Sequence, residues 1–265
     1  MSDDEQPPDR VLIWFSCGAT SAVAGKLALA EWPAAEVVRM RIDTEHPDGD
    51  RFAADVSRWY GRPIREITGQ FGDHLKAIRY HRYINGPTGA KCTRELKRKP
   101  REQYQRPGDL HVFGFDADEG ERTAEFRERN PDLRFVAPLV DAGLTKGDCK
   151  LILGRAGIEL PAMYRLGYAN NNCIGCVKGG AGYWNKIRLD FPQVFAEMAA
   201  IEREIGHTVL RHRKGPDKGK PLFLDQLDPA SGRFAEDQPA DCGVLCQAAL
   251  ARVGLDQPPE LTGGC

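Results

Sequence analysis

Short apolar runs alternate with helix-forming segments along the first half of this chain, and this alternation constrains its fold most. Val11–Phe15 has the length and apolar character of a buried strand. Similar runs follow at residues 37–42, 64–67, 110–115 and 134–139, with helical patterns at residues 22–32 and 52–60. Strands that alternate with helices favour a parallel sheet with helices on both faces. The sequence therefore predicts a three-layer α/β sandwich with a mostly parallel sheet.

The pattern changes near residue 150. Residues 191–205 form a clear amphipathic pattern, which predicts a helix. Residues 211–220 are basic and punctuated by Gly and Pro, as in an exposed loop. We therefore predict an α/β nucleotide-binding domain over residues 1–150 and a helical C-terminal region with clustered cysteines over residues 151–265.

The composition excludes several classes of protein. The net charge of −1 gives no global field toward nucleic acid or a membrane surface, so such a contact needs a local patch. No apolar run approaches the roughly 18 residues of a membrane span, and the acidic N-terminal segment is unlike a secretory signal. Eight cysteines in 265 residues are too few for a disulfide scaffold. The sequence thus predicts a cytoplasmic protein without a membrane partner, in which clustered thiols bind metal or act as catalysts.

Five cysteines have the spacing or the company of metal ligands. Cys173 and Cys176 form a C-x-x-C pair in a loop rich in Gly and Asn, where two thiolates can reach one metal. Soft thiolate ligands suit zinc or an iron–sulfur cluster. The predicted metal ligands are Cys92, Cys173, Cys176, Cys242 and Cys246. Cys149, in contrast, is expected to be a small buried apolar residue.

The segment over residues 11–32 has the parts of an anion site. Gly18 lets a phosphate approach the backbone, and the hydroxyl groups of Ser16, Thr20 and Ser21 can donate hydrogen bonds. The following helix adds free N–H groups and a favourable dipole at its N-terminus. The pattern is not a Walker A loop, because the G-x-x-x-x-G-K signature is absent. An ordinary strand–helix turn capped by Ser or Thr is the alternative.

Six segments resemble motifs of the PP-loop superfamily and occur in the same order. Residues 16–21, S-C-G-A-T-S, resemble the phosphate loop S-G-G-x-D-S of ATP pyrophosphatases and sulfonucleotide reductases. The other five resemble motifs of phosphoadenosine phosphosulfate (PAPS) reductases: residues 42–47 (I-D-T-G-x-x-x-P), 91–97 (C-C-x-x-x-K), 114–122 (G-x-R-x-x-E-S-x-x-R), 138–141 (P-L-x-x-W) and 160–176 (L-Y-x-x-G-Y-x-x-x-G-C-x-x-C). By these motifs the chain is similar to PAPS reductase-like proteins of phages and bacteria and to DNA phosphorothioation-type ATP pyrophosphatases.

The resemblance implies an adenine nucleotide alpha hydrolase-like fold and a role for each matching residue. Phosphates of ATP, PAPS or adenylylsulfate would be held by Ser16, Gly18, Thr20 and Ser21. Asp43 and Thr44 would lie near the adenosine, and the catalytic residues would be Lys97, Glu119 and Arg122. The implied cofactor is a 4Fe-4S cluster, with zinc as the alternative, and Mg²⁺ could accompany the nucleotide.

The chain also departs from the family pattern. Thr20 replaces the Asp of the phosphate loop, and Cys17 replaces its first Gly. Cys92 stands alone where cluster-bearing reductases have adjacent cysteines, so the fourth ligand is expected from Cys242 or Cys246. The C-terminal E-C-G-x-H signature of the reductases is missing.

Three functions remain open on the sequence. The first is ATP-dependent adenylylation and thiolation of a nucleic acid or a small molecule, with sulfur transfer assisted by the cluster. The second is reduction of PAPS or adenylylsulfate, for which Cys265 is the only terminal thiol. The third is a non-catalytic nucleotide-binding module with a structural zinc. The expected partners are an adenine nucleotide, a nucleic acid or a sulfur-donor protein, and a homodimer is left open.

Two further segments have two interpretations each. Trp184, shortly after the C-x-x-C pair, could stack on a base or anchor the amphipathic helix. The second segment is a dense basic stretch. It could contact a phosphate or a nucleic acid, or it could be a solvated helix face, and the sequence supports both equally. This stretch contains Arg94, Lys97, Arg98, Lys99 and Arg101.

Overall fold

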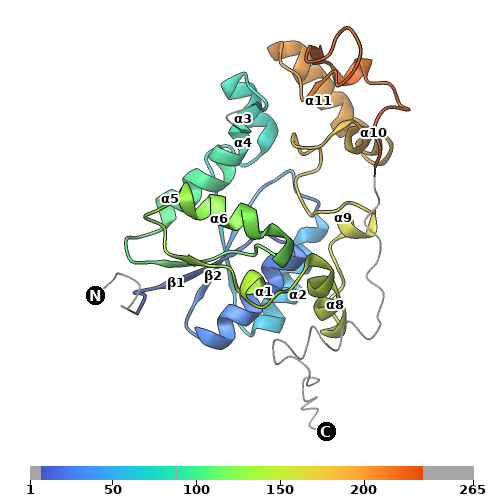
Figure 1. The fold of residues 1–265 in the computed structure, drawn as a ribbon. Helices are drawn as coiled ribbons and strands as arrows, with labels where there is room; N and C mark the ends of the chain where they lie inside the picture. The colour runs from blue at the N-terminus through green and yellow to red at the C-terminus, as the bar shows by residue number, and fades with distance from the viewer. Residues whose placement is uncertain (1–6, 87–88, 235–265) are drawn as a thin grey trace.

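A five-stranded parallel sheet forms the centre of the computed structural model, which describes residues 7–86 and 89–234 (Figure 1). Its strands are β1 (Val11–Phe15), β2 (Glu36–Arg41), β3 (Ile64–Thr68), β4 (Leu110–Val112) and β5 (Phe135–Val136). The order in the sheet is β3-β2-β1-β4-β5, and each neighbouring pair is parallel. Helices cover both faces, which confirms the predicted three-layer α/β sandwich.

Alternate residues of β1 face the two helical layers, because side chains along a strand point to opposite faces. Val11, Ile13 and Phe15 pack in the larger core. Leu12 and Trp14 pack on the other face. The larger core lies against α1 (Ala19–Glu31), α2 (Asp48–Tyr60), α7 (Pro138–Asp141) and α8 (Lys146–Arg155), whereas α5 (Lys99–Tyr104) and α6 (Gly120–Glu128) cover the opposite face.

A second hydrophobic core joins two parts of the chain that are distant in sequence. Ile78, Trp184 and Ile201, from three different helices, are fully buried in it. Its elements are α3 (His74–His81) and α4 (Lys91–Thr93), then α9 (Ala162–Arg165), α10 (Ala181–Asp190), α11 (Pro192–Ile205) and the hairpin of β6 (Leu210–Arg211) and β7 (Pro221–Leu222). Within the described residues, no helix is long and apolar enough to cross a membrane.

Two strands are shorter than predicted, each for a local reason. The run at residues 110–115 leaves the sheet early because Gly114 packs on the backbone of Ser21, where a Cβ would lie 2.7 Å from the Ser21 Cα. The run at residues 134–139 ends early because Pro138 begins α7, a position where the missing N–H of proline costs nothing.

The two cores divide the chain differently from the predicted domains. The predicted boundary at residue 150 falls inside α8, which packs in the first core beside α1. In turn α3, which lies within residues 1–150, packs in the second core with α11. The amphipathic helix predicted at residues 191–205 is confirmed as α11.

The strand order creates a crevice between β1 and β4. From β1 the chain proceeds to β2 and β3 on one side, whereas β4 and β5 lie on the other side. Ligands of parallel sheets bind beyond the carboxyl ends of strands where the order reverses in this way. The loops that follow β1 and β4 both carry residues predicted to bind the nucleotide or to catalyse the reaction.

Candidate active site

The loop between β1 and α1 is shaped by the side chain of Ser21. The Ser21 hydroxyl accepts hydrogen bonds from the backbone N–H groups of Ser16 (3.1 Å) and Gly18 (3.3 Å). It also donates to the carbonyl oxygen of Gly18 at 2.9 Å. Cys17 has a φ of 60°, a left-handed conformation that glycine adopts more readily. The Ser16 hydroxyl donates to the Ser21 hydroxyl at 3.1 Å. Ser21 is therefore occupied in holding the loop, whereas the exposed Ser16 and the half-buried Thr20 are accessible to a ligand.

Residues from beyond α8 support this loop. The Asn171 side-chain amide donates to the carbonyl oxygen of Cys17 at 2.7 Å. The backbone N–H of Ala19 donates to the Tyr164 hydroxyl at 3.3 Å. The phosphate loop and the segment that carries the C-x-x-C pair are thus directly connected, a link that the sequence alone did not indicate.

A cavity of about 490 Å³ opens over the crevice between β1 and β4, and we call it the phosphate-loop pocket. Its walls come from the β1 loop, the β4 loop and the basic stretch after α4. The predicted residues that line it are Ser16, Thr20, Ser21, Lys97, Glu119 and Arg122.

Glu119 and Arg122 form an ion pair across one wall of this pocket. The Arg122 guanidinium also lies 5.4 Å from the centre of the Phe115 ring. Because the Arg122 side chain is 67% exposed, the ion pair is weak and a bound anion can replace it. Asp116, which is buried nearby, caps the following 3₁₀ turn by accepting from the Asp118 N–H at 3.1 Å.

Asp43 and Thr44 do not line the phosphate-loop pocket. The Asp43 N–H donates to the Gly72 carbonyl at 3.0 Å, so the chain turns away from the crevice after β2. The Thr44 hydroxyl lies 2.7 Å from His74 Nδ1 and also hydrogen-bonds the sulfur of Cys173. Thr44 also accepts from the Ile174 N–H at 2.8 Å, so it supports the C-x-x-C loop, whereas Asp43 contacts Gly72.

Glu45 lines the phosphate-loop pocket instead. Its buried carboxylate lies 3.5 Å from the guanidinium of the equally buried Arg39. Burial raises the pKa of Glu45, while the charges of Lys97 and Arg39 oppose that rise. Glu45 occupies the position of Gly in the I-D-T-G motif. This departure from the motif was the sequence signal that could have indicated a carboxylate in the phosphate-loop pocket.

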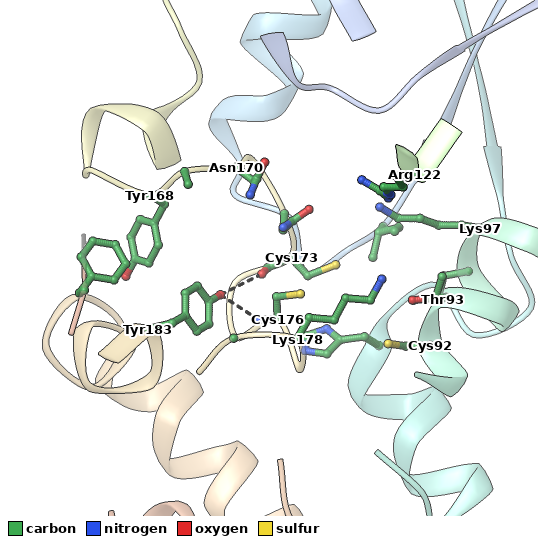
Figure 2. A pocket seen from close by; sticks show the side chains of 17 residues that line it. Cys92, Thr93, Lys97, Arg122, Tyr168, Asn170, Cys173, Cys176, Lys178 and Tyr183 are labelled. Carbon is green, nitrogen blue, oxygen red and sulfur yellow. Dashed lines mark hydrogen bonds between the residues drawn. The ribbon is translucent and has the colours of Figure 1, made fainter. Parts of the chain in front are cut away.

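Three of the predicted metal ligands line a second cavity of about 520 Å³, the cysteine pocket (Figure 2). Cys92 comes from α4, and Cys173 and Cys176 come from the loop before α10. Gly175, between the pair, has a φ of 76°, and a Cβ there would lie 2.8 Å from Val194. Glycine is therefore required for the C-x-x-C loop to adopt this shape.

Tyr183 fixes the backbone of the C-x-x-C loop. Its hydroxyl accepts from the Cys176 N–H at 2.9 Å and donates to the Cys173 carbonyl at 3.4 Å, the two dashed lines of Figure 2. Trp184, its neighbour, is fully buried against Phe195 of α11. Trp184 therefore anchors the amphipathic helix and is not available to stack on a base.

The environment of the Cys92 and Cys173 thiols favours their neutral form in the absence of a cation. Burial raises the pKa of Cys92, and it raises that of Cys173 to about 12, although the charge of Lys97 opposes both shifts. A bound metal supplies the positive charge that makes a thiolate stable at such a position. Cys149 is fully buried in the first core, as expected of a packing residue.

Cys92, Cys173 and Cys176 line one cavity, and their sulfur donors suit a soft cation such as zinc or the irons of a cluster. Within the described residues, no group of three His, Cys, Asp or Glu side chains is placed to hold a metal ion. Cys242 and Cys246, the predicted suppliers of a fourth ligand, lie outside the described residues, as does Cys265.

The two pockets share one wall. Lys97, Arg122, Asn170 and Asn172 line both of them. Figure 2 shows Lys97, Arg122 and Lys178 pointing toward the space in front of the cysteines. Sequence reasoning missed Lys178, although its place directly after the C-x-x-C loop was an available signal.

No family model, curated protein or solved structure matches this chain. The family resemblance therefore depends on the order of the sequence motifs.

Proposed function

We propose that this chain is a PP-loop enzyme that binds an adenine nucleotide in the phosphate-loop pocket and transfers sulfur with an iron–sulfur cluster held in the cysteine pocket. The observation that carries the proposal is the shared wall of Lys97, Arg122, Asn170 and Asn172. A group that is activated on the nucleotide in one pocket would lie directly beside the thiols of the other.

The phosphate loop combines hydroxyl donors with a helix N-terminus, and both favour a bound anion. Ser16 and Thr20 would donate hydrogen bonds to phosphate oxygens at the N-terminus of α1, which has 13 residues. The first turn of α1 contains no acidic side chain, so no charge there opposes a phosphate.

Lys97 and Arg122 would stabilise the negative charge that develops during adenylylation. The acceptor oxygen attacks the α-phosphate of ATP, the bond to the β-phosphate breaks, and pyrophosphate leaves with the electron pair. As the phosphates replace Glu119 on Arg122, the freed Glu119 would accept the proton of the attacking hydroxyl. Thr20 would offer Mg²⁺ a hydroxyl ligand where the family has a carboxylate.

Cys92, Cys173 and Cys176 would hold the cluster together with Cys242 or Cys246. The cluster, when bound, would supply the sulfur-transfer chemistry. Sulfide would form a bond to the carbon or phosphorus of the acceptor as the bond to the adenylylated oxygen breaks and AMP leaves. Lys97 and Lys178 would compensate the charge of the thiolates, in agreement with their effect on Cys92. Because such thiols must stay reduced, we assign this chemistry to the cytoplasm.

Nucleotide binding to the full-length, anaerobically purified protein tests the proposal. Calorimetry with ATP should give saturable binding that Ser16→Asp abolishes, because its carboxylate repels the phosphates, while Ser16→Ala retains most of it. Incubation with ATP and sulfide should release pyrophosphate when an acceptor is present. Release of sulfite from PAPS or adenylylsulfate would instead identify a sulfonucleotide reductase, and a colourless zinc protein would identify the non-catalytic module.

A further inference from the structure

Two short segments of this chain concentrate its positive charge. Residues 91–101 contain six Lys or Arg residues against one acid, and residues 211–220 contain five against one. Because the whole chain has a net charge of −1, the rest of the molecule carries a net charge of about −10. An asymmetry of this size creates a local positive potential that attracts a polyanion, although the net charge of the whole chain is close to zero.

The two basic segments flank the cysteine pocket from different sides. The first segment supplies four of the residues that line it, from Cys92 to Lys97. The second joins β6 to β7, and its Arg213 reaches the opposite rim. The Arg213 Nη2 atom lies 3.8 Å from the position of a Cβ on Gly180, next to the pocket-lining Gly179. In Figure 1 the β6–β7 hairpin lies beside α10 and α11, whereas α4 lies beside α3, on the other side of the second core.

Six of the Lys and Arg side chains in these two segments make no hydrogen bond or ion pair within the described residues. Five of the eleven cations are buried or already have a partner: Lys91, Lys99, Arg101, Arg211 and Lys220. The side chains of the other six are exposed, and within the described residues the structure gives these side chains no hydrogen bond or ion pair: Arg94, Lys97, Arg98, Arg213, Lys214 and Lys218. The π-helical turn Arg94–Arg98 presents the first three together.

An exposed aromatic side chain accompanies the cations. Tyr80 of α3 is 71% exposed, and its ring centre lies 5.2 Å from that of Phe71. The neighbouring His81 lies 3.3 Å from Glu95, which places Tyr80 beside the first basic segment. Basic side chains that follow a backbone, together with an exposed ring on which a base can stack, are typical of single-strand binding. Neither a lipid headgroup nor an acidic peptide offers a flat base that can stack on that ring.

We propose that single-stranded nucleic acid binds across the cysteine pocket, with its phosphates on Arg94, Lys97 and Arg98 on one side and on the hairpin cations on the other. A strand bound in this way passes in front of Cys92, Cys173 and Cys176 and beside the phosphate-loop pocket. Its role as the sulfur acceptor rests on the proposed function, whereas its binding does not.

Fluorescence anisotropy with a labelled oligonucleotide of about 20 nucleotides tests the surface, since single-strand sites span up to about 16 nucleotides. The full-length protein is used without ATP or added metal, so failure of the sulfur-transfer reaction does not affect the result. The double variant Arg213→Glu/Lys214→Glu should weaken binding at least tenfold. It should also lower the slope of log K against log salt by about 1.4, at roughly 0.7 for each lost phosphate contact.

A control variant introduces the same change of charge at residues outside both pockets. Arg58→Glu/Arg65→Glu alters two exposed arginines of α2 and β3 that line neither pocket, and binding should stay within about twofold because neither arginine would contact the strand. Tyr80→Ala should weaken binding about fivefold or more, at 1–3 kcal/mol for a stacked base, whereas Leu189→Ala, at another exposed apolar side chain, should not.

Three results would overturn the inference. One is equal loss of affinity in the two charge-reversal variants, which would indicate a non-specific charge effect. The second is tighter binding of a duplex of the same sequence with no effect of Tyr80→Ala, which would exclude a stacked single strand. The third is full competition by polyglutamate at the same charge concentration, which would indicate an acidic protein as the partner.

Discussion

A single hydroxyl group, that of Tyr183, holds both ends of the C-x-x-C turn. Tyr183→Phe removes this group and leaves the Cys176 N–H without its partner, at a cost of about 1 kcal/mol. We expect the metal-free variant to alkylate faster at Cys173 and Cys176, measured by mass spectrometry after timed iodoacetamide treatment. Tyr80→Phe, at an exposed ring, is the control. Unchanged alkylation in Tyr183→Phe would show that the loop keeps its shape without this contact.

The cysteines differ in role according to where their sulfur atoms lie. Cys173→Ser should lower the iron content of the purified protein, because a thiolate ligand of the cysteine pocket is lost. Cys149→Ser should leave the iron content unchanged and lower the free energy of unfolding by about 1–2 kcal/mol, since it buries a hydroxyl in the first core. Elemental analysis and thermal unfolding of both variants separate the two effects. Equal iron content in the two variants would contradict the ligand assignment.

At the scale of elements, the phosphate loop and the C-x-x-C loop form one unit through Asn171. Asn171→Ala removes the hydrogen bond to the Cys17 carbonyl, whose buried oxygen then lacks that donor. We expect nucleotide affinity to fall about fivefold to tenfold, at about 1–1.4 kcal/mol for the lost bond, with the metal content retained. Asn185→Ala is the matched control, because Asn185 also donates to backbone carbonyls, those of Asp228 and Ser231, and none of these residues lines either pocket. Calorimetry that gave the same affinity in both variants would exclude this coupling.

Elements with a local signal could be predicted from the sequence, and elements defined by distant contacts could not. The apolar run of β1 and the amphipathic pattern of α11 were sufficient to identify both. The turn of Thr44 toward the cysteines was not predictable, because it depends on the Ile174 N–H, which donates to the Thr44 carbonyl from 130 residues away in sequence. The sequence left Trp184 with two interpretations, and the packing of α10 against α11 decides for the helix anchor.

At the scale of the whole molecule, the second core contains a buried carboxylate that makes stability depend on pH. Glu202 is fully buried and accepts from the N–H groups of Val209 and Leu224, both at 2.6 Å. Burial raises its pKa from 4.5 to about 7, so the folded protein binds a proton that the unfolded chain has released between these values. The Glu202 contribution to stability is therefore complete below pH 4.5 and is lost as the pH rises toward 7.

Denaturant unfolding across this range should reveal the effect of Glu202. The free energy of unfolding of the unaltered protein, relative to Glu202→Gln, should fall by roughly 3 kcal/mol as the pH rises through the window. Glu204→Gln, at an exposed position of the same helix, should show the same pH dependence of the free energy of unfolding as the unaltered protein. Parallel curves for the unaltered protein and Glu202→Gln would exclude a raised pKa at this site.

In the proposed enzyme a nucleotide and an iron–sulfur cluster occupy adjoining pockets with a common wall. Titration of ATP into the anaerobically purified protein, followed by visible circular dichroism, tests it most directly, because the signal comes from the cluster and the ligand binds next to it. We expect a brown protein with about four irons per chain. We also expect a saturable spectral change on addition of ATP, which Ser16→Asp abolishes. A colourless protein, or a cluster spectrum that does not respond to bound nucleotide, would contradict it.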